Sequence, residues 1–156
     1  MSDMTLLHFA CKAGAAGIGD PQVAAEVVQD LISRGGDVYA RCKWTQMTPL
    51  HYAALFDAAP ILQILLNASQ AMDIESPCND HENGTALHIA AANLAFNSAV
   101  VLVEFGASTK LKDNLGRTPL GRGYQLVVQL HVVVLYGKRK SFISLLSTRR
   151  FVVLLF

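Results

Sequence analysis

The chain has 156 residues, of which 52% are hydrophobic and only 16% are charged, which suits one folded domain and excludes a charge-rich disordered chain. Its formal net charge of +1 hides an uneven distribution, because residues 1–120 carry seven basic and twelve acidic side chains whereas residues 121–156 carry six basic and no acidic ones. Since phosphate binding needs a basic face, the acidic balance of the first part argues against a nucleic-acid partner.

The cysteines favour a reducing compartment. Cys11, Cys42 and Cys78 are an odd number at irregular spacing, which fits neither a disulfide framework nor a Cys-x-x-Cys metal site. The first residues show no charged segment followed by an apolar one, as a signal peptide requires. We therefore expect a cytoplasmic protein.

A short motif recurs along the chain. It reads Thr-Leu-Leu-His-Phe-Ala-Cys from residue 5, Thr-Pro-Leu-His-Tyr-Ala-Ala from residue 48 and Thr-Ala-Leu-His-Ile-Ala-Ala from residue 85, and it begins once more as Thr-Pro-Leu at residue 118. Successive threonines are 43, 37 and 33 residues apart. Self-similarity at intervals of 20–50 residues indicates a repeat array.

The residue types of the motif suit the start of a helix. The Thr48 hydroxyl can accept from a backbone N–H two or three residues on, and Pro49 fits the first helical position. Leu50, Ala53 and Ala54 then share one face, where the small alanines allow a neighbouring helix to approach closely.

This motif resembles the ankyrin repeat, whose signature is Thr-Pro-Leu-His-x-Ala. The resemblance implies an all-α solenoid of about three helix-turn-helix repeats plus a truncated fourth, followed by an irregular non-ankyrin tail. The repeats are expected at about 4–36, 47–80, 84–108 and, in part, 113–120, within a domain of residues 1–120. The implied function is a non-catalytic scaffold that binds a protein on the concave face of the stack, with no cofactor and no metal.

Second helices are predicted from apolar spacing. Val27, Val28, Leu31 and Ile32 form one stripe at helical spacing. Similar stripes recur at 61–66 and 99–103. Gly35-Gly36 and Gly106 suit the left-handed residue after a helix, whereas residues 67–69 suit it less well. Residues 37–47, 73–84 and 108–117 then become the hairpin-like fingers that connect repeats.

Extra residues in two repeats are expected in exposed loops. The first insertion is placed at residues 14–21, between the two helices of the first repeat. Its glycine spacing also suggests a phosphate-binding loop, but no Gly-Lys-Ser/Thr follows. The second is placed at residues 76–82, where Cys78, His81 and Glu82 raise a metal alternative that lacks further ligands.

The motif histidines raise the same alternative. His8, His51 and His88 occur once per repeat, so they are spread along the stack instead of converging on one ion. The family resemblance implies that each histidine bonds its neighbours at the helix start.

The repeat pattern fails after Leu120, and residues 121–156 are predicted to be a divergent, poorly ordered tail. Apolar runs at 126–136 and 151–156 alternate with basic residues, and the longer run is too short to span a bilayer. A truncated or splice-variant product explains such a segment best. As an alternative function, the basic and apolar tail associates with membrane surfaces.

A closer resemblance concerns the first repeats. Residues 5–14, the Gly-Asp-Pro insertion and Trp44-Thr45-Gln46-Met47-Thr48 resemble the N-terminal ankyrin region of the restin-like CAP-Gly domain-containing linker proteins. This implies a microtubule-associated parent and a cytoskeletal location. The Gly-Lys-Asn-Asp-Gly motif of the CAP-Gly domain does not occur in this chain. Any role inherited from such a parent therefore belongs to the repeats.

Contact positions carried over from the ankyrin family fall on one finger and on the ends of two first helices. They are Trp44, Thr45 and Met47 in the finger, Leu55 and Phe56 after the second motif, and Ala92 and Asn93 after the third. Trp44 is the main candidate, since rigid aromatic residues are frequent binding hot spots. The alternative is that Trp44 and Phe56 only cover the core.

An enzyme is not expected, because no nucleophile is paired with a base and an orienting group. Cys11 lies near His8 in the sequence, but it stands at a motif alanine where burial is expected.

Overall fold

The computed structural model describes residues 4–14 and 19–124, which form an all-α repeat fold. Residues 119–124 at the end of this part are also helical. The elements in chain order are α1 (Leu6–Ala13), α2 (Pro21–Ser33), α3 (Pro49–Leu55), α4 (Ala59–Ser69), the 3-10 helix η1 (Asn79–His81), α5 (Ala86–Ala92) and α6 (Phe96–Glu104).

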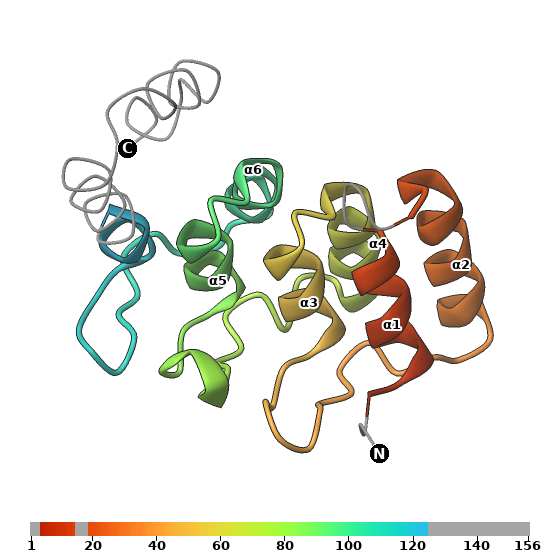
Figure 1. Ribbon diagram of the computed structural model, residues 1–156, viewed down its shortest axis with the longest axis horizontal. Coiled ribbons are helices and arrows are strands. Elements are labelled where there is room, and N and C mark those ends of the chain that lie inside the picture. Colours follow the sequence, from red (N-terminus) through yellow and green to blue (C-terminus); the bar gives the residue numbers. More distant parts are fainter. Residues whose placement is uncertain (1–3, 15–18, 125–156) are drawn as a thin grey trace, which may run out of the picture.

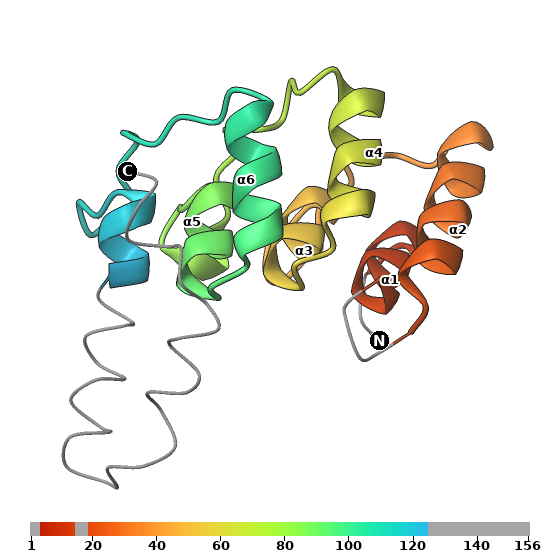
Figure 2. The same ribbon diagram turned by 90° about the horizontal axis from the view of Figure 1, so that it is seen from above.

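The helices stack as three antiparallel pairs in two rows (Figures 1 and 2). α1, α3 and α5 form the inner row and α2, α4 and α6 the outer row, and each helix packs against its partner and its neighbours in the same row. The connecting segments 37–47, 73–84 and 108–117, named the first, second and third fingers, project from one side of the stack. The predicted all-α solenoid is confirmed.

One continuous core runs between the rows. Its large members are leucines and isoleucines at matching positions of successive repeats: Leu50, Ile61, Leu62, Leu65, Leu66, Leu87 and Leu102 are all at most 2% exposed. The motif alanines Ala53, Ala54 and Ala90 are fully buried between neighbouring inner helices. Since one helix pair cannot bury its own apolar face, stability comes from stacking.

Most helix boundaries follow the predicted signals. The Asp20 side chain accepts a hydrogen bond from the Gln22 N–H (2.9 Å) at the start of α2, so α2 begins at the last residue of the predicted insertion. Gly35 and Gly106 adopt the expected positive φ angles of +87° and +93°. α4 runs to Ser69, and Gln70 takes the left-handed conformation with φ +51°.

Two features differ from expectation. Val27 is 45% exposed although the stripe predicted it on the buried face, because within residues 4–14 and 19–124 no other repeat covers that side of α2. Helical structure continues from residue 119 to 124, four residues beyond the predicted end of the repeats. The remainder of the predicted tail, with its proposed membrane contact, lies outside the described residues. In the described ranges, no helix is long and apolar enough to cross a membrane.

Candidate functional site

Each motif histidine bonds the threonine that stands just before the first residue of its own inner helix. In α3, Nδ1 of His51 accepts the Thr48 backbone N–H at 3.1 Å, and the Thr48 hydroxyl lies 2.8 Å from the same nitrogen. The histidine occupies the place that Glu or Gln takes in an ordinary capping box. The same arrangement recurs at His8 and His88, so the expected bonds at the helix start are confirmed.

The opposite ring nitrogen joins each repeat to a later finger. Because Nδ1 accepts a backbone N–H, the neutral ring carries its proton on Nε2 and donates it. Nε2 of His8 lies 3.1 Å from the Met47 carbonyl, and Nε2 of His51 lies 2.9 Å from the Ser76 carbonyl. His88 repeats the contact at 3.1 Å to the Arg117 carbonyl. One ring per repeat therefore holds the fingers against the inner helices.

Burial sets the charge state of these rings. It is the largest cause that lowers the pKa of His8, His51 and His88 below 6.5, and it lowers the pKa of His51 to about 4. All three rings are therefore neutral at pH 7. Both nitrogens of each ring already have hydrogen-bond partners, which leaves neither as the ready ligand that a metal site needs.

The first finger is held from both sides. The Arg41 guanidinium donates to the Gln46 carbonyl (2.8 Å) within the finger and to the Pro77 carbonyl (3.0 Å) of the second finger. The Cys42 N–H donates to the Met47 carbonyl at 3.0 Å, and the Gln46 N–H donates to the Cys42 carbonyl at 2.9 Å. These bonds fix the backbone on either side of the tip.

Trp44 stands at this fixed tip with 80% of its surface exposed. The Lys43 ammonium lies 6.0 Å from the centre of the indole ring, within the range of a cation–π contact. Next to it, the Thr45 carbonyl accepts from the Cys78 thiol at 3.3 Å. Trp44 is thus a large aromatic side chain on a short, internally bonded hairpin.

The other predicted contact residues in this region differ in exposure. Met47 is only 2% exposed and packs with Cys78 and Ile89 beneath the finger, so its side chain does not reach the surface. We therefore correct the expected contact role of Met47. Thr45 is half-buried, and its hydroxyl accepts from the Met47 N–H at 3.3 Å. Leu55 is half-buried and packs against the same small cluster.

Phe56 belongs to a row of rings along the inner helices. It stacks on Tyr52 with ring centres 6.3 Å apart, and Tyr52 in turn meets the edge of His8 at 5.4 Å. Phe56 is half-buried and therefore both covers the core and exposes part of its ring. In the third repeat, Ala92 is half-buried, and the exposed Asn93 donates its side-chain amide to the Ile89 carbonyl at 2.8 Å.

The third finger is built around a buried carboxylate. Asp113 accepts from the backbone N–H groups of Leu115 (3.0 Å) and Arg117 (2.9 Å), and the Arg117 guanidinium lies 2.8 Å away. Burial pushes the pKa of Asp113 upward, but the hydrogen bonds from Arg117 and Leu115 outweigh it and lower that pKa overall.

Arg122 connects this finger to the second one. Its Nη2 lies 2.7 Å from the Glu82 carboxylate, and its Nη1 donates to the His81 carbonyl at 2.8 Å and lies 3.7 Å from Asp113. The predicted tail began at residue 121, yet Arg122 lies beyond that boundary and holds the second and third fingers together at the end of the described stack.

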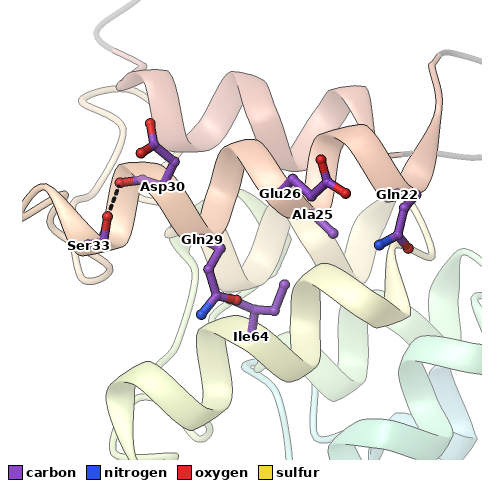
Figure 3. Close-up of a pocket in the computed structure, with 7 residues that line it drawn as sticks. All are labelled: Gln22, Ala25, Glu26, Gln29, Asp30, Ser33 and Ile64. Carbon is purple, nitrogen blue, oxygen red and sulfur yellow. Dashed lines mark hydrogen bonds between the residues drawn. The ribbon is translucent and has the colours of Figure 1, made fainter.

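A separate groove lies between the outer helices α2 and α4 (Figure 3). It measures about 400 Å³ and is lined mainly by polar side chains of α2, with Ile64 on the side of α4: the lining residues are Gln22, Ala25, Glu26, Gln29, Asp30, Ser33 and Ile64. The Ser33 hydroxyl donates to the Asp30 carbonyl at its edge. None of the predicted contact residues lines this groove.

The cysteines are all buried. Cys11 is 0% exposed, as its place at a motif alanine predicted, and burial raises the pKa of its thiol to about 12. A thiol of this kind stays protonated at neutral pH and is a poor nucleophile.

Comparison with known proteins identifies the repeats. The family model "Ankyrin repeats (3 copies)" matches residues 7–113. The chain belongs to the ankyrin-repeat family. It is 46% identical over 119 residues to CAP-Gly domain-containing linker protein 3 of Mus musculus, and 45% identical over the same length to that of Homo sapiens. Each alignment covers 76% of this chain but only 22% of the relative.

A more distant relative shares only the repeats. The chain is 31% identical over 107 residues to the neurogenic locus Notch protein of Drosophila melanogaster, which covers 67% of this chain and 4% of that protein. Ankyrin repeats form protein–protein interaction domains, so the coarse function follows from the family.

The ankyrin consensus did not reveal two residues that shape this surface. Arg41 crosses from the first finger to the second, and Arg122 crosses from the helical residues 119–124 to the second finger. Each partner is 36 to 41 residues away. Lys43 stands where the third finger has Asp113, so the first finger lacks a carboxylate at that position.

Proposed function

We propose that this chain is a non-catalytic ankyrin module that binds a target protein along its fingers and inner helices, with Trp44 as the main anchor. The observation that carries the proposal is the exposed Trp44 on a hairpin held by Arg41 and by the bonds between Cys42 and its neighbours. An anchor fixed before binding loses little conformational entropy on contact, and tryptophan is a favoured hot-spot residue.

The remaining contacts follow from exposure. Thr45 belongs to the first finger, Leu55 packs against the cluster beneath it, and Phe56 stacks on Tyr52 of α3. Ala92 and Asn93 are proposed to extend the surface to the third repeat. Met47 is left out because it is buried. We place these contacts on the concave side of the stack, where they run across successive repeats and suit an extended segment of a partner.

The relatives are named as linker proteins that contain CAP-Gly domains. We propose that the repeats supply the target-binding part of such a linker, in the cytoplasm, and that any link of this chain to microtubules is indirect. In a co-pelleting assay the purified chain is expected to stay in the supernatant with polymerised tubulin. Direct pelleting at micromolar concentration contradicts the indirect link.

The test of the anchor compares three full-length proteins: wild type, Trp44→Ala and Met72→Ala. Met72 is also 80% exposed but lies outside the proposed surface, so it is the matched control. Proteins captured by wild type and Met72→Ala, but not by Trp44→Ala, are the candidate targets. Truncating a hot-spot residue costs about 2 kcal/mol or more, so purified targets are expected to bind Trp44→Ala at least about 30-fold more weakly.

Fluorescence gives an independent readout. Trp44 is the only tryptophan in the chain, so its emission reports its own surroundings. Addition of a purified target is expected to shift the emission to shorter wavelength as water is excluded from the ring. Unchanged emission, together with equal affinity of Trp44→Ala and wild type, refutes the anchor.

A further inference from the structure

The outward side of the first helix pair is an exposed apolar surface at one end of the stack (Figures 1 and 2). We name it the end face and define it by Leu6, Phe9 and Ala13 of α1 and Val23 and Val27 of α2. Its four large side chains are between 45% and 72% exposed. These residues recur at helical spacing on the sides of α1 and α2 that point away from α3 and α4.

The positions equivalent to Leu6 and Val27 in the later repeats are buried. Leu6 corresponds to Ala86 of the third motif, which is 0% exposed. Val27 corresponds to Ile61 of α4 and Ser98 of α6, which are both 0% exposed because the preceding repeat covers them. The end face therefore has the chemistry of an internal stacking surface, although no repeat lies upstream of it in the described residues.

The end face carries both a protruding ring and a hollow. A hollow of about 300 Å³ lies between α1 and α2 and is lined by Ala10, Ala13, Val23, Ala24 and Val27, with Gly19 and Asp20 at its rim. The exposed Phe9 directly precedes Ala10, one of the lining residues, on α1. A hollow of this size accommodates an aromatic side chain.

Two acidic side chains near the end face have partners within the chain. The Asp20 carboxylate accepts the Gln22 N–H, and the Asp30 carboxylate pairs with Arg34 at 2.8 Å. The ion pair compensates the charge of Asp30, whereas the backbone N–H leaves Asp20 with its negative charge at the rim of the hollow, and this like charge on both copies opposes close pairing.

We propose that two copies of this chain pair through their end faces about a two-fold axis, with Phe9 of each copy filling the hollow of the other. A two-fold interface uses the same patch on both subunits, so a ring and a hollow on one face make each contact twice. Head-to-tail growth is disfavoured, since the helical residues 119–124 already lie against α5, where Gly123 approaches Ala91.

The interface is small. Four large apolar side chains per copy place it at the low end of the roughly 1,200–2,000 Å² that specific complexes bury. The pairing is therefore weak, and its extent depends on protein concentration in the micromolar range. It does not involve Trp44, so it is independent of target binding along the fingers.

The primary test is sedimentation velocity of the full chain over a concentration series. Val27→Glu places a charge in the end face and is expected to weaken self-association at least about tenfold. Val103→Glu is the matched control, because Val103 is a valine of similar exposure (40%) on α6, at a distance from the end face. It is expected to change the association less than about twofold. Circular dichroism of each variant is first matched to wild type.

A cross-linking test covers the case in which Val27→Glu unfolds the chain. The native cysteines are buried, so a cysteine introduced by Val23→Cys is the reactive one. Mild oxidation is expected to give a disulfide-linked dimer of Val23→Cys and not of Val103→Cys.

Several results overturn the proposal. One is a wild-type chain that stays monomeric at every concentration, and another is equal weakening by Val27→Glu and Val103→Glu. A third concerns the apolar run at 126–136: if Val133→Glu with Leu135→Glu abolishes association and Val27→Glu does not, that run is the contact instead. Absence of the Val23→Cys cross-link in associated protein has the same consequence.

Discussion

Acid should loosen the stack through its buried histidines, and His51 gives the clearest case. Its ring is buried, Nδ1 accepts the Thr48 N–H, and Nε2 donates to the Ser76 carbonyl. A second proton must go on Nδ1, where it opposes the Thr48 N–H and loses its hydrogen bond. The folded state therefore resists protonation, and burial lowers the pKa of His51 to about 4, against 6.5 in the unfolded chain.

The sign and size follow from linkage. The unfolded chain binds more protons between pH 6.5 and pH 4, so the stability contributed by neutral His51 is complete above pH 6.5 and falls as the pH drops through this window. At pH 5 the two pKa values correspond to a loss of about 2 kcal/mol from this residue alone. His8 and His88 shift in the same direction and add to the loss.

The assay is urea unfolding of the full chain at pH 7.5 and pH 5, for wild type and for His51→Gln. The carboxylates titrate in both proteins, so their contribution cancels when the two pH-dependent losses are compared. Wild type is expected to lose about 2 kcal/mol more than His51→Gln between these pH values. If the losses agree within about 0.5 kcal/mol, the ring does not titrate as described and the reasoning is wrong.

Two further predictions concern the ion pairs of Arg122 and the buried thiols. Arg122→Gln is expected to lower the free energy of unfolding by about 1–2 kcal/mol in urea at pH 7, because it removes a partner from Glu82 and from buried Asp113. The control is Arg34→Gln, in an exposed ion pair, which should change the free energy of unfolding by less than about 0.5 kcal/mol. Equal effects of the two substitutions refute the distinction. The buried cysteines are expected to react with a thiol reagent at least about 100-fold more slowly in the native chain than in urea. Rapid labelling of Cys11 alone contradicts this and revives a nucleophilic role.

The sequence predicted what local chemistry determines. The motif threonines mark the starts of α1, α3 and α5, since a capping pair needs only residues three positions apart. Gly35 and Gly106 mark helix ends, because few other residues accept a positive φ angle at low cost. The placement of the first insertion before α2 followed from Asp20 and Pro21 in the same way.

What the sequence did not reveal depends on residues that meet only after stacking. Nothing in the spacing of His51 indicates that its Nε2 reaches Ser76, or that Arg41 crosses to the second finger. The family resemblance predicted a contact role for Met47, yet its side chain is buried against Cys78 and Ile89. Burial of this kind is set by the neighbouring repeat, whose side chains the local pattern does not specify.

The atoms that receive the Nε2 protons have a consequence for how such a chain can diversify. They belong to the main chain of Met47, Ser76 and Arg117, three residues with unrelated side chains. A backbone carbonyl oxygen is present whatever amino acid occupies the position, so these hydrogen bonds between repeats do not depend on the side chain at that position. The residues of the fingers can therefore be substituted to bind a new target, in evolution or by design, while the histidines continue to hydrogen-bond each repeat to the following finger.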